Sequence, residues 1–347
     1  MRIETEVKLD FCDVLIRPKR STLSSRNDVS LFRELIFPHT KNKIYTIPLL
    51  VSNLYVTGTI TMAKAIEKHN CAVVLHKFYS NDVLYNFFHD SKDNSARLNH
   101  WVSIGINDND LAKFDDLYKK FAVPNLCVDI ANGYQEVFVE KIKYLRDKYK
   151  NLNIMAGNVV TGDMTEALLL AGADVVKIGI GNGNLCTTRK VTGVGYPQLS
   201  AVIECADAAH GLKGLVCSDG GITCTGDIAK AFCAGADFVM AGSIFVGHDE
   251  CECEIIEENN KKYVIAYGMS SKMAQEKHFN IKNYRASEGR EVKALYKGSV
   301  ESTISEILGG LRSTLTYIGA NKLKEASKRT TFVMVNRQVS NYFNDVN

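Results

Sequence analysis

Eight short apolar runs that alternate with helical patterns constrain the fold of this chain more than any other feature. The runs are rich in valine, isoleucine and leucine, as strands buried on both faces are, and they lie at residues 48–52, 71–75, 101–104, 126–130, 153–156, 174–178, 215–218 and 237–240. Amphipathic patterns lie between several of them, at residues 57–69, 135–148, 164–171 and 226–234. Because parallel strands need a crossover of about a dozen residues, the alternation predicts a (β/α)8 barrel of the α/β class. A doubly wound open sheet is the alternative.

An internal repeat supports this βα unit. Ala-Gly-Ala-Asp occurs at residues 171–174 and again at residues 234–237. Both copies end a helical pattern and begin an apolar run, which is typical of equivalent turns in a repeated unit.

The remaining segments are expected to extend a single barrel domain, residues 1–347, because no low-complexity linker divides the chain. Residues 1–47 are predicted to form an N-terminal extension, and residues 48–250 carry the barrel strands. Residues 250–300 are predicted to form a β-hairpin excursion, with its turn near Asn259 and Asn260, followed by a mobile flap. Residues 301–347 should form a C-terminal helix, over 301–319, and a tail.

Composition argues against two classes of function. Hydrophobic residues make up 46% of the chain and charged residues 23%, an ordinary globular balance. The net charge of +3, from 42 basic and 39 acidic residues, is too even to predict nucleic-acid or membrane binding through bulk charge. The chain contains no run of about 18 apolar residues, the length that would predict a membrane span.

The cysteines favour a reducing, cytoplasmic setting. Most of the ten lie in apolar runs, none forms a Cys-x-x-Cys pair, and the first residues carry no signal-peptide pattern. Cys251 and Cys253 could form half of a metal site, but no His or Cys set with ligand spacing accompanies them.

Polar or glycine residues follow the predicted strands. Barrel enzymes carry their chemistry on loops at the carboxyl ends of the strands. The residues at these positions are Asn53, His76, Lys77, Asp129, Gly157, Asn158, Asp219, Gly220, Gly221, Gly242 and Ser243, together with the loop at 179–186.

One of these loops carries a single cysteine among glycines, reading Gly-Asn-Gly-Asn-Leu-Cys-Thr-Thr-Arg at residues 181–189. Glycines let the backbone approach a ligand closely. Backbone dipoles around a loop thiol can hold it as the reactive thiolate. By this pattern alone Cys186 is either a nucleophile or a chance cysteine in an ordinary loop.

Six segments together carry a resemblance to a known family. They are Phe-Cys-Asp-Val-Leu-Ile-Arg-Pro at 11–18, Cys-Thr-Thr-Arg at 186–189, Thr-Gly-Val-Gly-Tyr-Pro-Gln-Leu at 192–199, Ser-Asp-Gly-Gly-Ile at 218–222, Tyr-Gly-Met-Ser-Ser at 267–271 and Tyr-Arg-Ala-Ser-Glu-Gly at 284–289. In this order and register they resemble the IMP dehydrogenase/GMP reductase family over nearly the whole chain.

Spacing indicates the GMP reductase branch of that family. IMP dehydrogenases carry a long flap with an Arg-Tyr pair that activates water, and most insert a regulatory module into the barrel. Here Glu288 follows Ser270 by only 18 positions, and neither the pair nor the insertion occurs. The segments at 158–162 and 285–289 are similar to GMP reductases.

The resemblance implies NADPH-dependent reductive deamination of GMP to IMP and ammonia. In this chemistry Cys186 attacks C2 of the guanine ring, which divides a difficult displacement into two steps through a covalent thioimidate. Glu288, acting through the hydroxyl of Thr188, supplies the proton for the ammonia. Without the resemblance, Glu288 would be predicted to be a solvent-exposed carboxylate of the flap.

The resemblance also implies a set of residues that contact GMP or IMP. Asp219 would accept hydrogen bonds from the ribose hydroxyls, although it could instead cap the following helix. Backbone amides near residues 184, 221, 242 and 243 would hold the phosphate. The whole set is Asp219, Gly220, Gly221, Gly242, Ser243, Gly268, Met269, Ser270, Arg285, Ala286, Ser287 and Gly289.

The cofactor, a cation and an assembly are implied in the same way. The residues implied for NADPH are Ser25, Arg26, Lys77, Asp129, Ile130, Ala131, Ile180, Gly181 and Met269. Ser25 and Arg26 would reach the cofactor of a neighbouring subunit in a homotetramer, where an arginine suits the 2′-phosphate of NADPH. A potassium ion (K+) would bind at the loop of Gly181, Gly183, Cys186 and Arg189.

Several positions depart from the family pattern. The usual Asn-Met-Asp-Thr-Val after the first strand is Asn-Leu-Tyr-Val-Thr here, so Tyr55 replaces a carboxylate and should reshape the cofactor side of the pocket. Asn182 replaces a proline, which should loosen the loop; Asn184 replaces a serine and Ser243 a glycine. Because Cys186, Thr188, Asp219 and Glu288 are all retained, we expect an active enzyme. The alternatives are an IMP dehydrogenase and a catalytically weakened nucleotide-binding relative.

Overall fold

Eight parallel strands close into a barrel in the computed structural model, which describes residues 1, 3–90, 98–184, 186–268 and 289–336. The strand order around the barrel is β10-β11-β4-β5-β6-β7-β8-β9. The strands are β4 (Leu49–Val51), β5 (Ala72–Leu75), β6 (Trp101–Ile104), β7 (Asn125–Asp129), β8 (Asn153–Val159), β9 (Val175–Ile178), β10 (Leu215–Asp219) and β11 (Phe238–Ala241). The predicted (β/α)8 barrel is confirmed. The open sheet is wrong, because β11 pairs with β4 and closes the ring.

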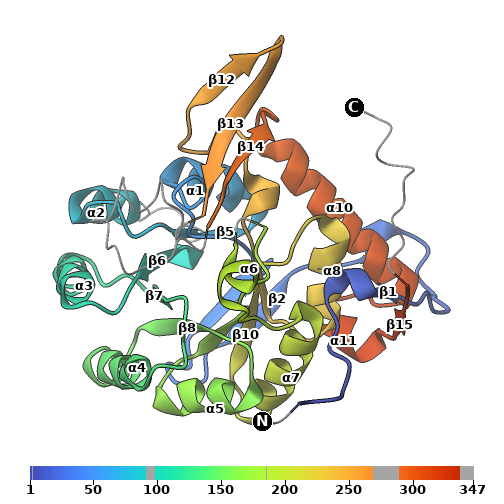
Figure 1. Ribbon diagram of the computed structural model, residues 1–347, viewed down its shortest axis with the longest axis horizontal. Coiled ribbons are helices and arrows are strands. Elements are labelled where there is room, and N and C mark those ends of the chain that lie inside the picture. Colours follow the sequence, from blue (N-terminus) through green and yellow to red (C-terminus); the bar gives the residue numbers. More distant parts are fainter. Residues whose placement is uncertain (2, 91–97, 185, 269–288, 337–347) are drawn as a thin grey trace.

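Helices surround this barrel (Figure 1). They are α1 (Ile60–Ile66), α2 (Asn81–His89), α3 (Asp108–Lys120), α4 (Glu136–Lys148), α5 (Gly162–Ala171), α7 (Gln198–Gly211), α8 (Thr225–Cys233) and α10 (Glu301–Ile318). The four predicted patterns between strands correspond to α1, α4, α5 and α8. The pattern at 57–69 yields a shorter helix because Thr59 caps it, its side chain accepting from the Met62 N–H. A short helix, α6 (Thr188–Thr192), follows the cysteine.

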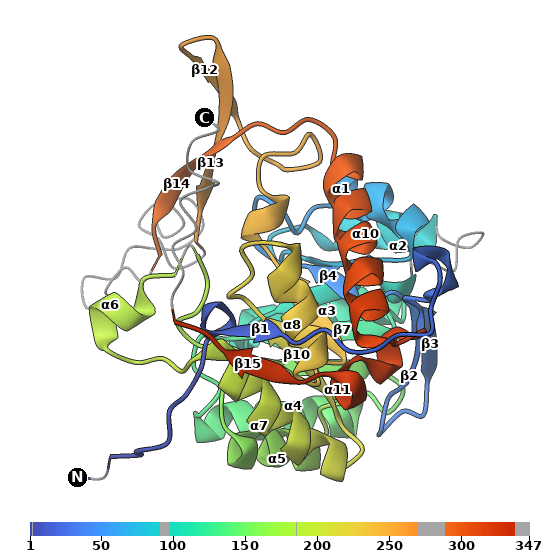
Figure 2. The same cartoon turned by 90° about the vertical axis from the view of Figure 1, so that its right-hand side faces the viewer.

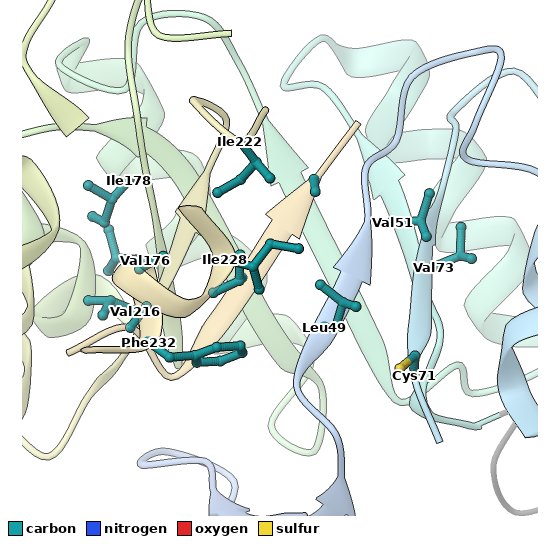
Figure 3. Packing of buried hydrophobic residues seen from close by; sticks show 14 of the residues in the cluster. Leu49, Val51, Cys71, Val73, Val176, Ile178, Val216, Ile222, Ile228 and Phe232 are labelled. Atoms are coloured by element: carbon teal, nitrogen blue, oxygen red, sulfur yellow. The ribbon is translucent and has the colours of Figure 1, made fainter. Parts of the chain in front are cut away.

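The side chains of each barrel strand alternate between two cores. Outward-facing residues such as Val176 and Val216 pack against the helices, among them Ile228 and Phe232 of α8 (Figure 3). Inward-facing residues fill the barrel; they include Leu50, Val74, Cys127, Met155, Val175, Cys217, Phe238 and Met240. Period-two alternation in the strands produces both cores from single apolar runs.

An antiparallel hairpin closes the amino-terminal end of the barrel. Strands β2 (Arg33–Ile36) and β3 (Lys43–Thr46) pair within the N-terminal extension, where the sequence predicted no strands. Leu35 and Phe37, from the hairpin, are buried in the barrel core. The Phe37 ring meets the edge of Trp101 at a centroid distance of 6.0 Å. The extension is therefore part of the barrel core.

The repeated Ala-Gly-Ala-Asp turns lie at this same end. Gly172 and Gly235 have φ values of +118° and +114°, which a residue with a Cβ rarely adopts. The two aspartates that follow each accept a backbone N–H from the preceding strand, Asp174 from Ile154 and Asp237 from Val216. The repeat thus ties neighbouring strands together.

A three-stranded antiparallel sheet projects from the barrel (Figure 2). β12 (Ile255–Glu258) and β13 (Lys261–Tyr267) form the predicted hairpin, with φ near +51° and +60° at Asn259 and Asn260, as a tight hairpin turn requires. The third strand, β14 (Glu291–Leu295), pairs with β13. The segment expected to form a mobile flap thus contains a strand, β14, that the sequence analysis did not predict, and residues 269–288 lie outside the described residues.

One further strand pair was not anticipated. β1 (Val14–Ile16) of the N-terminal extension pairs antiparallel with β15 (Phe332–Met334) near the other end of the chain, and Figure 2 shows the two side by side. Within the part of the chain that the structure describes, no helix is both long and apolar enough to cross a membrane.

Candidate active site

A buried lysine lies between two aspartates at the carboxyl-terminal end of the barrel. Strand alternation points Lys177 into the barrel, as it does Val175 two residues earlier. Its Nζ lies 2.7 Å from Asp219 Oδ2 and 3.0 Å from Asp129 Oδ1, and its side chain is only 3% exposed. Burial disfavours the ammonium, but attraction to Asp129 and Asp219 outweighs it and raises the pKa of Lys177 well above its usual value. Lys177 is therefore charged.

Two asparagines complete this group. Asn53 donates to Asp129 Oδ2 at 2.7 Å, and Asn158 donates to Asp219 Oδ2 at 2.9 Å. Burial raises the pKa of Asp129, but Lys177 and the Asn53 hydrogen bond together lower it below its usual value. The Oδ1 atom of Asn158 is buried and has no hydrogen-bond partner among the described residues. We call these five residues the mouth network.

The cysteine loop lies beside the mouth network and holds its thiol next to a hydroxyl. Cys186 Sγ is 3.1 Å from Thr188 Oγ1, and the Thr188 N–H points to the sulfur at 3.5 Å. The Cys186 N–H donates to the Gly183 carbonyl at 2.9 Å. Gly289 forms a backbone bridge to Cys186. A partly exposed thiol with a hydroxyl and an N–H at hand is suited to nucleophilic chemistry.

Most of the other thiols are buried. Burial raises the pKa of Cys71 to about 12 and the pKa of Cys233 to about 11, so both stay as inert thiols. Within the described residues, no group of three His, Cys, Asp or Glu side chains could hold a metal ion. The possible half-site at Cys251 and Cys253 therefore has no third ligand of these types among the described residues.

Three of the departures from the family pattern hydrogen-bond within this site. The Asn182 side chain donates to the Asp219 carbonyl at 2.9 Å. The Asn184 side chain donates to Ser243 Oγ at 2.8 Å, and Ser243 Oγ donates to the Ile222 carbonyl at 3.2 Å. These bonds connect the loops that follow β9, β10 and β11. The contact from Asn182 opposes the loosening expected from the loss of proline.

Tyr55, the other departure, belongs to an aromatic wall. Its ring stacks on His76 at 5.1 Å and on Tyr267 at 6.1 Å, and His76 stacks on Tyr79 at 4.1 Å. This wall borders an open cavity of about 370 Å³ beneath the projecting sheet, lined by Tyr55, Val56, Glu252, Cys253, Glu254, Ile265 and Tyr267. Tyr55 thus connects the first barrel loop to the sheet.

The structure brings most of the predicted substrate residues in the described ranges to this end of the barrel. Gly220 and Gly221 follow β10 with φ of +84° and +74°, which turns the backbone toward the cysteine loop. Gly242 and Ser243 follow β11, and the Gly268 N–H donates to the Arg290 carbonyl next to Gly289. Six predicted residues lie outside the described ranges: Met269, Ser270, Arg285, Ala286, Ser287 and Glu288.

The residues predicted for the cofactor fall into two places. Lys77, Asp129, Ile130, Ala131, Ile180 and Gly181 follow barrel strands at the same end as the thiol. Ser25 and Arg26 do not: Ser25 caps the short 3-10 helix η2 (Arg26–Asp28), which lies against α10 on the outside of the barrel. The chain's own fold therefore does not bring Ser25 and Arg26 to its own mouth network.

The residues fit the two implied groups in different ways. The carboxylate of Asp129 and the orphaned Oδ1 of Asn158 give NADPH polar partners at the barrel mouth. For K+, the Gly183 carbonyl accepts from the Cys186 N–H and keeps a second lone pair for a cation. The Arg189 side chain instead bonds Asp10 and the Tyr196 carbonyl, so only its backbone could face an ion.

Lys177 is the functional residue that the sequence analysis missed. It was read as part of an apolar strand. The signal was available, because a lysine at an inward-facing position of a buried strand requires a partner.

A closed (β/α)8 barrel with a loop thiol and paired carboxylates at the carboxyl ends of its strands has the architecture of a barrel enzyme. Comparison with known proteins then identifies the family. A model described as "IMP dehydrogenase / GMP reductase domain" matches residues 8–341. GMP reductase 1 of Rattus norvegicus is 52% identical over 347 residues, covering 99% of both chains. GMP reductase of Caenorhabditis elegans is 52% identical over 344 residues, covering 99% of this chain and 96% of its own. This chain belongs to the IMP dehydrogenase/GMP reductase family, and the predicted resemblance is confirmed.

Proposed function

We propose that this protein is a GMP reductase, an oxidoreductase that converts GMP and NADPH to IMP, ammonia and NADP+. The observation that carries the proposal is the contact of 3.1 Å between Cys186 Sγ and Thr188 Oγ1. It joins a nucleophile to a hydroxyl that can pass a proton, and both functions are needed to displace ammonia from an aromatic ring. Full-length identity of 52% to curated GMP reductases supports the same activity.

The chemistry assigns one role to each reacting residue. Cys186 Sγ, as thiolate, attacks C2 of the guanine ring, and the exocyclic nitrogen leaves as ammonia once protonated. The Thr188 hydroxyl passes that proton from Glu288, which is assigned from the family motif. NADPH, when bound, supplies the hydride that adds at C2, after which the thiolate leaves and IMP is released. Gly289, next to Glu288 in sequence, bridges to Cys186, which supports the assignment.

The nucleotide is proposed to lie across the loops after β9, β10 and β11. Asp219 accepts from the ribose hydroxyls. Backbone N–H groups near Asn184, Gly221, Gly242 and Ser243 hold the phosphate, because N–H groups gathered at loop turns, such as the positive-φ turn at Gly221, form an anion-binding concavity. Residues 268–270 and 285–289 contact the base.

NADPH is proposed to bind on the side of Lys77 and Asp129, with Ile130, Ala131, Ile180, Gly181 and Met269. Ser25 and Arg26 are proposed to act on the cofactor of a second copy, because they lie on the outer surface beside α10. This requires an oligomer, which we propose to be a homotetramer. K+ is proposed to bind the carbonyls of Gly181, Gly183 and Cys186. All ten cysteines lie in the described residues and none of them forms a disulfide, which supports the proposed cytoplasmic location.

The decisive experiment mixes the protein with GMP and NADPH and follows the loss of nicotinamide absorbance. We expect turnover in the wild type, and we expect Cys186→Ala to abolish it while GMP still binds by calorimetry. Oxidation of IMP with NAD+, in place of GMP reduction, would favour the dehydrogenase. Binding of GMP without turnover by the wild type would favour a weakened nucleotide-binding relative.

A further inference from the structure

Lys177 joins two carboxylates that the proposed function assigns to two different ligands. Asp129, at the end of β7, is on the cofactor side, and Asp219, at the end of β10, is on the nucleotide side. We propose that Lys177 is a positioning residue that makes binding of GMP and binding of the dinucleotide cofactor mutually reinforcing. The proposal rests on the proposed function and goes beyond it, because Lys177 touches neither reacting atom.

The geometry of the mouth network gives a continuous path between the two sides. Asn53 bonds Asp129, Asp129 bonds Lys177, Lys177 bonds Asp219 and Asp219 bonds Asn158, over donor–acceptor distances of 2.7 to 3.0 Å. The five side chains come from β4, β7, β8, β9 and β10 or the residues just after them. A displacement of either carboxylate therefore has to move the ammonium, which moves the other carboxylate.

The electrostatics make this link strong. The ammonium is 3% exposed, so little water competes for its donors. One positive charge faces two carboxylates, and each carboxylate also holds an asparagine amide. When a ribose hydroxyl donates to Asp219, part of that carboxylate's charge is taken up and the ammonium is free to hold Asp129 more firmly.

The coupling between the two binding events should be positive because both ligands order the same mouth network. The first ligand to bind fixes one carboxylate, and through the ammonium it fixes the other. The second ligand then meets an acceptor that is already oriented and loses less conformational entropy on binding. By thermodynamic reciprocity, the cofactor strengthens nucleotide binding by the same factor as the nucleotide strengthens cofactor binding.

Removal of the ammonium breaks the path. In Lys177→Met, the two carboxylates that the ammonium had contacted face each other with no cation between them, and like charges that close repel. Each ligand then binds a carboxylate whose orientation no longer depends on whether the other ligand is bound.

The test uses GMP and NADP+, a pair that cannot react because the cofactor is already oxidised. The dissociation constant of GMP is measured by calorimetry without NADP+ and with saturating NADP+. We expect the wild type to bind GMP at least about fivefold more tightly with NADP+, and we expect this ratio to fall to one in Lys177→Met. Lys230→Met is the matched control: that lysine, on α8, is 13% exposed and paired with Asp227, so its loss should keep the wild-type ratio.

Folding is checked by circular dichroism and thermal melting. Should Lys177→Met fail to fold, Asp129→Asn and Asp219→Asn each remove one arm of the path and must each bring the ratio to one. A wild-type ratio of one, or a folded variant that keeps the wild-type ratio, would overturn the inference. Failure of the proposed function is a separate result, since then the wild type would not reduce GMP with NADPH at all.

Discussion

The two ends of the barrel both bury charged side chains, but they surround them differently. At the amino-terminal end, Asp174 accepts from Arg146, from the Ile154 N–H and from the His39 N–H, and it is fully buried. At the carboxyl-terminal end, Asp219 and Asp129 share one ammonium and stay 19% and 29% exposed. One end gives its carboxylates several fixed protein donors, and the other leaves them open to a ligand.

The difference follows from what covers each end. The β2–β3 hairpin inserts Leu35 and Phe37 and excludes water, so a charge there must be satisfied by the protein. No such hairpin covers the carboxylates at the opposite end among the described residues, and Asp129 and Asp219 stay partly exposed there. We therefore propose that the same fold uses ion pairs for stability at one end and for ligand binding at the other. The predictions below test this division.

The largest effect is expected from Asp174→Ala. The substitution leaves the Arg146 guanidinium, 2.5 Å from the carboxylate in the wild type, buried without its counter-charge. We expect the free energy of unfolding to fall by about 3–5 kcal/mol, measured by urea denaturation, with normal turnover per folded molecule. Asp147→Ala, which removes an exposed pair with Lys150, is the control and should change stability little. Equal losses in the two variants would contradict the assignment.

At the opposite end, Thr188→Val should leave stability unchanged and impair catalysis. The variant loses the hydroxyl beside Cys186 Sγ. We expect kcat to fall at least about a hundredfold, as when a proton-transfer group is removed, under saturating GMP and NADPH. Thr188→Ser keeps the hydroxyl and should retain most of the activity. If serine and valine behaved alike, a proton relay at this position would be ruled out.

Two glycine variants compare the ends more finely. An added Cβ at Gly172 would lie 2.5 Å from Arg146 side-chain atoms, and φ is +118°. At Gly193, which ends α6, φ is +74° and no heavy atom of the described residues would lie within 4 Å of an added Cβ. We expect Gly172→Ala to lower the free energy of unfolding by about 2 kcal/mol or more and Gly193→Ala by about 1 kcal/mol. The order of the two midpoints in urea is the check, and a reversed order would refute the steric argument.

The smallest effect concerns pH. The hydrogen bond to Asp237 raises the pKa of His210 above its usual value, against opposing desolvation. Its stabilising contribution is complete below the unfolded pKa, about 6.5, and is lost as pH rises through the folded pKa. Because the side chain is 46% exposed, we expect less than about 1 kcal/mol. His210→Gln should flatten the decline of melting temperature above about pH 6.5; an unchanged decline would exclude His210 as its source.

The barrel strands could be predicted closely because each is a short β-branched run between turn residues. The prediction at 101–104 coincides with β6, and β8 extends three residues past its prediction, to Val159. The β14 strand was missed although residues 291–294 alternate polar and apolar. That alternation covers only a few residues of a long segment that shows no regular hydrophobic period, so the sequence analysis did not recognise it.

The candidate site was predicted unevenly. The resemblance predicted Cys186, Thr188, Asp219 and Asp129 as site residues, and the structure brings all four to the same end of the barrel. The resemblance did not identify Lys177, nor that Asn184 and Ser243 would compensate for each other by a hydrogen bond. Both findings depend on which side chains meet across different strands and loops.

Local patterns of polarity and the placement of glycines were enough to predict the order and periodicity of the barrel units and the kinds of chemical groups at the strand ends. Two features could be learned only from the folded chain: the N-terminal hairpin seals one end of the barrel, and a single ammonium holds two carboxylates at the other. Both depend on closure of the barrel, which brings residues distant in sequence within hydrogen-bonding distance, where burial removes the water that would otherwise separate them.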